Sequence, residues 1–185
     1  MTLEQQLEKL AELGIRLDDG ISIDDLLYSF GRAEYEETPF KLILFVLGIE
    51  VERAPWGRSI CSRVWNFDTE CINSTGDYAR IVKRLCHVAG KPDCLVDISD
   101  HVDIEAGEAW IKYQVGDAER TWDAEVNDDW ADTLTLSYVM EDIESEGQRF
   151  YSMDNGQAMV LFYLDSKTAS ELNRLSGNVL KPVLA

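Results

Sequence analysis

The sequence predicts an α+β fold, in which N-terminal helices are followed by a mostly antiparallel sheet with helices packed on it. Three observations support this prediction. Helix caps and helical periodicity dominate residues 1–50, alternating apolar runs and turn signals dominate residues 58–177, and no repeat interrupts the chain. With 185 residues, 45% of them hydrophobic, the chain has the length and composition of a single α+β domain over residues 1–185.

The first quarter of the chain opens with two predicted helices. Thr2 begins the first helix, because the glutamine three residues later completes a capping box, and Gly14 ends it. Ser22 and Asp25 form a similar cap for a second, short helix that ends at Gly31.

A third helix is expected in the longest apolar block of the chain. Thr38 and Pro39 are typical of an N-cap and a first helical turn, Phe40 to Leu47 would form the helix, and Gly48 would close it. The block over residues 40–49 has about half of the ~20 residues that a membrane span requires. We therefore expect a buried helix here and not a transmembrane one.

The next predicted strand and helix flank a polar connection. Ile60 to Phe67 alternates between two sets of side chains, which predicts a strand with mixed faces. Helical spacing of apolar residues over 78–89 predicts a helix that begins near Asp77 and ends at Gly90. Strand-to-helix connections often carry binding and catalytic residues, so residues 68–76 are a candidate site.

Three runs rich in β-branched and aromatic residues predict strands over residues 94–99, 108–115 and 120–126. A turn at Gly116–Asp117 would connect the last two runs. Alternation in the second run predicts a sheet with one packed face and one partly wet face. The polar stretch "DISDHVDIE", residues 97–105, is expected to be a loop between two strands.

The C-terminal third predicts a helix, a hairpin and a final helix. Residues 128–145 favour a helix with acids at both ends. Asn155–Gly156 is typical of a two-residue hairpin turn that needs positive φ at both positions. Asp165 or Ser166 would cap the final helix, and Gly177 would stop it.

Charge is the most unusual property of the chain, because 17 basic and 35 acidic residues give a net charge of −18. Residues 93–132 alone carry 13 acidic and 2 basic side chains, a net charge of −11. Such a field repels nucleic-acid phosphates and anionic membranes, and it speeds the encounter with a basic protein. We therefore predict a protein partner, without direct nucleic-acid or membrane binding; the alternative is a solvated acidic surface that serves solubility. The predicted partner-binding acids are Asp100, Asp103, Glu105, Asp117, Glu119, Asp123, Asp128 and Asp129.

Asp68, Glu70 and Cys71 define an alternative function, a small intracellular enzyme in which His101 would complete the site. A thiol nucleophile needs a nearby base. His87 lies about 15 Å along the following helix, at 1.5 Å per residue, so a local pair with Cys71 is not expected. The simpler interpretation is that these residues end a strand and lead into a helix cap.

We expect neither a metal nor a cofactor. Residues 97–105 contain acids but lack the glycine and the final acid of a calcium loop. The four cysteines include no CxxC pair and are typical of reduced thiols in the cytoplasm. Acids stand at the N-terminus where a signal peptide carries bases, which also predicts a cytoplasmic protein.

The five tryptophans are further candidates for binding. We predict that Trp56 is exposed in a loop, that Trp65 lies in a strand, and that Trp110, Trp122 and Trp130 pack between sheet and helix. The alternative for the last three is an interface anchor ringed by acids.

The order of these parts resembles that of small acidic immunity proteins from bacterial polymorphic-toxin systems. The resemblance spans roughly residues 34–175, and its strings are "FDTECI" leading to "GDYARIVKRL", the later "DDWAD", and "NGQAMVLFYL" before a short helix. It implies a protein that binds and neutralises a toxin without catalysis. A basic nuclease fits the charge, because nucleases are positive where they hold phosphate. An acidic adaptor or interaction module is the remaining alternative.

Overall fold

The structure is a computed structural model that describes residues 1–145 and 147–184. Its helices are α1 (Leu3–Glu12), α2 (Ile23–Ser29), α3 (Arg32–Glu37), α4 (Lys41–Val46), α5 (Asp77–Val88), α6 (Thr133–Ile143) and α7 (Ser166–Ser176). Its strands are β1 (Val64–Asp68), β2 (Val96–Asp103), β3 (Glu108–Val115), β4 (Ala118–Asp123), β5 (Gln148–Asn155), β6 (Ala158–Asp165) and β7 (Leu180–Pro182). The α+β class is confirmed, with helices at the N-terminus followed by antiparallel strands.

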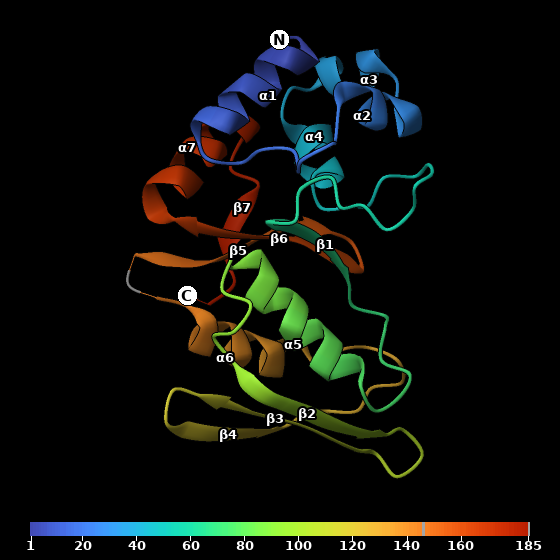
Figure 1. The fold of residues 1–185 in the computed structure, drawn as a ribbon, viewed down its shortest axis with the longest axis vertical. Helices are drawn as coiled ribbons and strands as arrows, with labels where there is room; N and C mark the ends of the chain where they lie inside the picture. Colours follow the sequence, from blue (N-terminus) through green and yellow to red (C-terminus); the bar gives the residue numbers. More distant parts are fainter. Residues whose placement is uncertain (146, 185) are drawn as a thin grey trace.

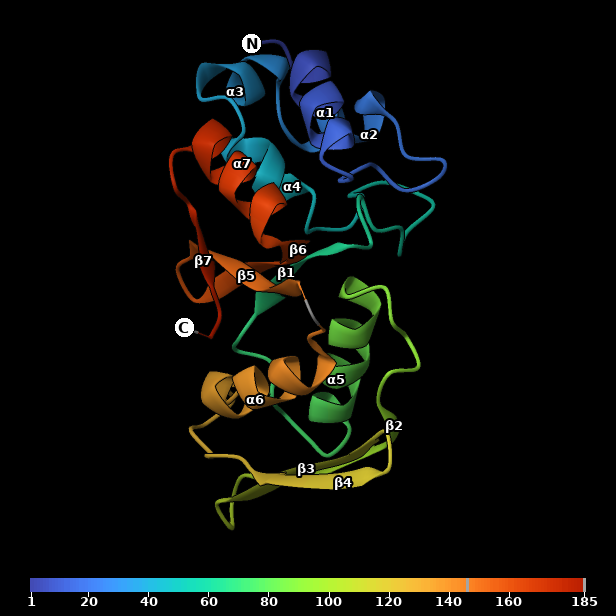
Figure 2. The same ribbon diagram turned by 90° about the vertical axis from the view of Figure 1, so that its left-hand side faces the viewer.

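Four layers are stacked along the long axis of the molecule (Figures 1 and 2). The N-terminal helices and α7 form the first layer, and an antiparallel sheet of order β1-β6-β5-β7 forms the second. Helices α5 and α6 form the third layer, and the antiparallel sheet β2-β3-β4 forms the last. The strands therefore make two sheets, and the expectation of one sheet was wrong because α5 and α6 lie between them.

The central strand β6 separates two hydrophobic cores. Val160 and Phe162 belong to the core shared with the N-terminal helices, whereas Leu161 and Tyr163 belong to the core shared with α5 and α6. Both faces of this strand are buried, which explains its nearly continuous run of apolar residues. Helix α7 contributes Leu172 to the first core, so the two ends of the chain pack together.

The N-terminal helices depart from the prediction around Thr38. The Thr2 capping box is present, but Gly31 begins the unpredicted helix α3, which ends at Thr38. Helix α4 begins after Phe40, whose φ is 68°, so Thr38 and Pro39 do not form its N-terminus as predicted. The cause is tertiary, because the buried Gln6 side chain accepts a hydrogen bond from the Phe40 N–H at 2.8 Å and donates one to the Tyr35 carbonyl at 2.8 Å.

Two expected strand boundaries also change. Only the second half of the predicted strand over residues 60–67 is extended, because the Val64 N–H donates to the Cys61 carbonyl in a turn. Most of the expected loop over residues 97–105 is strand β2, paired with β3.

The C-terminal predictions are mostly confirmed. The β5–β6 hairpin is present, although its two-residue loop is Gly156–Gln157, and of the expected pair only Gly156 has positive φ. Asp165 caps α7 and Gly177 ends it in the left-handed conformation. The short strand β7 was not predicted. Across the described residues, no helix combines the length and the apolarity that a membrane crossing requires.

Asp25 is a buried carboxylate in the first layer, and it predicts acid sensitivity. Hydrogen bonds from the Ser22 N–H at 2.9 Å and from Arg53 and Arg58 lower its pKa below the usual value. A depressed folded-state pKa adds stability above the unfolded pKa of about 4, and this stability is lost as the pH falls through the folded value.

We expect Asp25→Asn to lower the free energy of unfolding measured with urea at pH 7. Below about pH 4 the wild type should lose further stability, and the variant should lose less, because it has no carboxylate at position 25 to protonate. Asp24→Asn is the matched control, because Asp24 lies beside Asp25 on the exposed side of α2. Equal acid sensitivity of Asp25→Asn and wild type would contradict this role for Asp25.

Candidate functional site

The far side of the β2-β3-β4 sheet is turned away from both helices of the third layer (Figures 1 and 2). Residues paired across an antiparallel ladder point to the same side, and alternate residues of a strand share a face. The register therefore defines the outward side chains, which we call the outer acidic face. They are Val96, Ser99, His101, Asp103, Glu108, Trp110, Lys112, Gln114, Glu119, Thr121 and Asp123.

The inward side of the same sheet is held by a polar network. The Tyr113 hydroxyl donates to the Asp142 carboxylate of α6 at 2.7 Å and accepts the Trp122 indole N–H at 2.9 Å. The Trp122 ring stacks on Tyr138 of α6, with centroids 5.1 Å apart. Arg120 pairs with Asp142 at 3.3 Å. This network orients the sheet on α6 and gives the outer acidic face a rigid support.

Seven of the eight predicted acids lie on the outer acidic face or in adjoining loops. Asp103, Glu119 and Asp123 are on the face itself. Glu105 is in the β2–β3 loop and Asp117 in the β3–β4 turn, both exposed. The remaining two, Asp128 and Asp129, lie in the loop between β4 and α6.

Sequence reasoning left out Glu108 as a binding residue, although it is exposed and pairs with Asp103 on the outer acidic face. The alternation of β3 was the signal that could have identified it. Lys112 is the single basic residue of this face, and its ammonium pairs with Glu119 at 2.9 Å. Asp103, Glu108 and Asp123 therefore gather at the end of the sheet away from that ion pair.

Asp100 does not belong to the outer acidic face, because it points inward and is only 8% exposed. Its carboxylate accepts hydrogen bonds from the Gly76 N–H at 2.9 Å and the Tyr78 N–H at 3.1 Å. These amides are at the N-terminus of α5, where a negative charge is favourable. We therefore correct its assignment: Asp100 joins β2 to α5 and is too buried to be a docking residue.

Trp110 is the aromatic centre of the outer acidic face. It is half-buried, and its ring stacks on His101 with centroids 5.9 Å apart and planes inclined by 28°. Asp123 is its direct partner on the other side. The expectation that Trp110 packs between sheet and helix was wrong, since the alternation of β3 turns it outward. Trp130 was also placed wrongly, because its side chain is 37% exposed in a loop.

The connection that contains Asp68, Glu70 and Cys71 is tied together locally. The Glu70 carboxylate accepts a hydrogen bond from the Gln157 side-chain amide at 2.8 Å, and the Glu70 backbone N–H donates one to the Asp68 carboxylate at 3.1 Å. Burial raises the pKa of the Cys71 thiol to about 11, and the nearby Asp68 carboxylate adds to this shift. The thiol is protonated at neutral pH, which is the opposite of an activated nucleophile. His101 is on the outer acidic face, whereas Cys71 packs against the core on the inner side.

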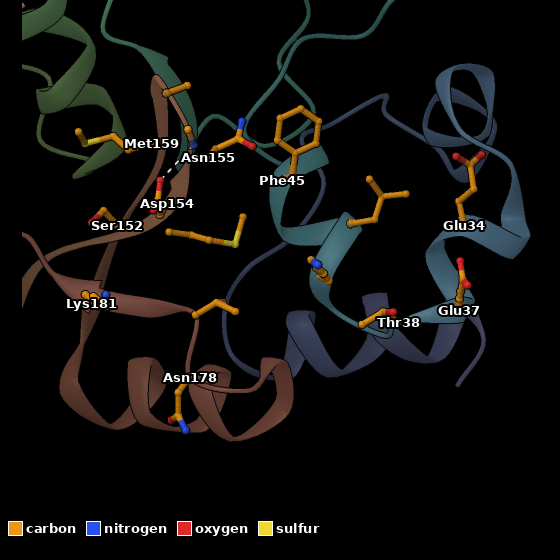
Figure 3. A pocket seen from close by; sticks show the side chains of 16 residues that line it. Glu34, Glu37, Thr38, Phe45, Ser152, Asp154, Asn155, Met159, Asn178 and Lys181 are labelled. Carbon is orange, nitrogen blue, oxygen red and sulfur yellow. Dashed lines mark hydrogen bonds between the residues drawn. The ribbon is translucent and has the colours of Figure 1, made fainter.

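A groove of about 890 Å³ lies on another part of the molecule, between α3 and α4, the β5–β6 hairpin and β7 (Figure 3). Phe45, Met153 and Met159 supply apolar lining, and acidic and basic residues also line the groove. Asp154 and Lys181 are among them (Figure 3). Because its charges are mixed, this groove lacks the predominantly negative charge of the outer acidic face. Within the described residues, no group of His, Cys, Asp and Glu side chains is arranged to hold a metal ion.

No protein-family model, curated protein or solved structure matches this chain.

Proposed function

We propose that the protein is an immunity-type inhibitor, which binds a basic toxin domain through the outer acidic face and thereby neutralises it. One observation carries this proposal. Asp103, Glu108 and Asp123 stand around an outward-facing tryptophan on a sheet whose other side is tied to α6. Carboxylates around an aromatic anchor complement a basic surface, and such anchors contribute much of the binding energy in protein interfaces.

The contact that fits this arrangement is an arginine or lysine side chain of the partner above the Trp110 ring. The ring face attracts a cation, and directly paired side chains on neighbouring strands lie about 5 Å apart. Asp123 is therefore within reach of the same cation as Trp110. A guanidinium group would stack on the ring and share its N–H donors with a carboxylate.

An inhibitor, an enzyme and an adaptor differ in the number and kind of proteins that they bind. The protonated Cys71 thiol gives no support to the enzyme alternative. An adaptor would bind several proteins, whereas an immunity-type inhibitor binds one toxin tightly. Affinity purification from the source cell tests this difference, with a Glu108→Gln/Asp123→Asn variant as the comparison. One basic partner that the variant captures less well supports the proposal, and several partners or none contradict it.

We expect Glu108→Gln/Asp123→Asn to slow association with that partner several-fold, because exposed charges act mainly on encounter, and to speed dissociation less than the loss of Trp110 does, because the amide oxygen introduced at position 123 can still accept from the guanidinium. Association of the wild type should also slow as salt shortens the Debye length from about 30 Å at 0.01 M to about 10 Å at 0.1 M. Surface plasmon resonance at both salt concentrations measures these rates.

The matched control is Glu8→Gln/Asp19→Asn, which removes the same charge from exposed positions near the N-terminus. A similar slowing by both variants, or a wild-type rate independent of salt, would show that the acids serve solubility.

Trp110→Ala should instead increase the dissociation rate by about tenfold or more, because buried interface tryptophans typically contribute over 1.4 kcal/mol. Trp56→Ala is the control, since Trp56 is 71% exposed in the loop before β1, outside the outer acidic face. Unchanged dissociation of Trp110→Ala would exclude Trp110 as the anchor.

A further inference from the structure

Strand β4 forms one edge of the β2-β3-β4 sheet, at the end of the molecule away from the N-terminal helices (Figure 2). Its register with β3 is uninterrupted, and just beyond its end the Ala124 N–H donates to the Ala109 carbonyl at 2.9 Å. Hydrogen-bonded and non-hydrogen-bonded pairs alternate along an antiparallel ladder. The bond between Ala124 and Ala109 therefore shows which residues of β4 bond to β3 and which point to the free edge.

The residues of β4 whose backbone groups point away from β3 are Glu119, Thr121 and Asp123. The Asp123 carbonyl accepts a hydrogen bond from the Thr135 hydroxyl at 3.2 Å, which closes the edge at that end. The backbone N–H and carbonyl groups of Glu119 and Thr121 have no hydrogen-bond partner among the described residues. The centre of β4 therefore presents a row of open donors and acceptors, with which another strand can pair.

The other sheet edges are interrupted by local contacts. At β1 the Asn66 N–H donates to the Gly48 carbonyl at 2.8 Å. At β2 the Val102 N–H donates to the Thr75 hydroxyl at 2.9 Å, and the same hydroxyl lies 3.4 Å from the Val102 carbonyl. Strand β7 has three residues and ends at Pro182, which has no N–H to donate. Within the described part of the chain, the centre of β4 has no such contact.

Charge determines which kind of strand fits this edge. The side chains of Glu119, Thr121 and Asp123 are exposed and belong to the outer acidic face. A second copy of β4 paired antiparallel about Thr121 would place Glu119 opposite Asp123, and like charges directly opposite are unfavourable. A basic strand would instead place cations opposite both acids. Lys112 of β3 shares Glu119, so Asp123 offers the stronger contact for such a cation.

We propose that the basic toxin domain adds an extended segment to β4, as a fourth and antiparallel strand of this sheet. The inference rests on the proposed function and names how the partner is held at the outer acidic face. Basic side chains four residues apart in the segment lie opposite Glu119 and Asp123, and a β-branched residue midway lies opposite Thr121. The same segment residues exchange backbone hydrogen bonds with β4. Trp110, Asp123 and one cation of the segment then form a row across the sheet.

The test uses the capped peptide Val-Lys-Val-Thr-Glu-Arg-Val, whose lysine, threonine and arginine would lie opposite Asp123, Thr121 and Glu119. It is added to the isotope-labelled full-length protein and followed by NMR. We expect slower amide hydrogen exchange at Glu119 and Thr121 in the complex. The amides of Arg120 and Trp122 bond to β3 and should exchange slowly even without the peptide, so they are the internal control.

Thr121→Pro separates strand pairing from charge. It removes the N–H that points to the free edge and no bond to β3, an orientation in which edge strands tolerate proline. We expect it to weaken peptide binding by about tenfold or more, because the ring also blocks the approach of the segment. The Thr121→Val control keeps the N–H and should bind as the wild type does.

Two modified peptides give the same test even if Thr121→Pro does not fold. N-methylation of the peptide threonine removes an N–H that would face β4 and should weaken binding by about tenfold. N-methylation of the peptide glutamate removes an N–H that would face away from β4 and should leave binding unchanged. Equal effects of the two modifications would contradict the pairing.

A peptide that shifts the Trp110 resonances and leaves exchange at Glu119 and Thr121 unchanged would overturn the pairing with β4 but not the proposed function. Failure of the proposed function is a different result, in which affinity purification captures several partners or none. No peptide binding at millimolar concentration would also overturn the pairing. A dimer that protects Glu119 and Thr121 without peptide, detected by sedimentation, would show that a second copy occupies the edge instead.

Discussion

Gly48→Ala is expected to lower the free energy of unfolding by about 3 kcal/mol. Gly48 passes so close to β1 that a Cβ atom would lie 2.6 Å from the Asn66 nitrogen and 3.0 Å from the Trp65 carbonyl carbon. These are backbone atoms, so no side-chain rotation can relieve the contact. The approach is fixed because the Asn66 N–H donates to the Gly48 carbonyl at 2.8 Å. Urea unfolding followed by tryptophan fluorescence measures the loss.

Gly31→Ala is the matched control for this prediction. Gly31 also has negative φ, and its added Cβ would meet only the movable end of the Glu34 side chain, at 3.3 Å. We expect it to cost less than about 1 kcal/mol. If both variants lose the same stability, the close approach of Gly48 to β1 is not the cause.

Asp100→Ala is expected to lower the free energy of unfolding by about 2–3 kcal/mol. The substitution leaves the amides of Gly76 and Tyr78 without the buried carboxylate that they share. It also removes a negative charge from the N-terminus of α5. Because this carboxylate joins β2 to α5, we further expect faster amide hydrogen exchange in the first turn of α5, measured by mass spectrometry.

Asp117→Ala removes an equivalent charge from the exposed β3–β4 turn and should change stability by less than about 0.5 kcal/mol. This pair of variants separates a buried acid that joins β2 to α5 from an exposed acid that contributes only its charge. Equal stability of Asp100→Ala and Asp117→Ala would mean that Asp100 does not hold the start of α5.

The candidate site could be predicted from the sequence only along its central strand. Alternation in β3 places Ala109, Ile111 and Tyr113 on one side, and the structure confirms that all three are buried. The same alternation turns Trp110 outward, but the scarcity of basic neighbours favoured the opposite prediction, in which Trp110 packs between sheet and helix. The stack on His101 and the pairing with Asp123 come from neighbouring strands, whose register a single strand does not specify.

Strand β2 shows why composition misled at residues 97–105. Its polar residues predict a loop, yet Ser99, His101 and Asp103 face water while the backbone pairs with β3. Asp100 points inward and is stabilised by the amides of α5. A strand can carry polar side chains where they face water or form hydrogen bonds with another element, such as the first turn of a helix.

Local sequence patterns are sufficient to identify the caps of α1 and α7, the periodicity of α5, the alternation of β3 and the uneven negative charge, because each depends on residues close together in the chain. Long-range contacts, in contrast, are responsible for the division into two sheets, the burial of Asp100 and the helix boundary at Phe40. Asp100 and Gly76 are 24 residues apart, and Gln6 and Phe40 are 34 residues apart. Such contacts form only when the whole chain has folded, because the burial that makes them favourable requires the surrounding core.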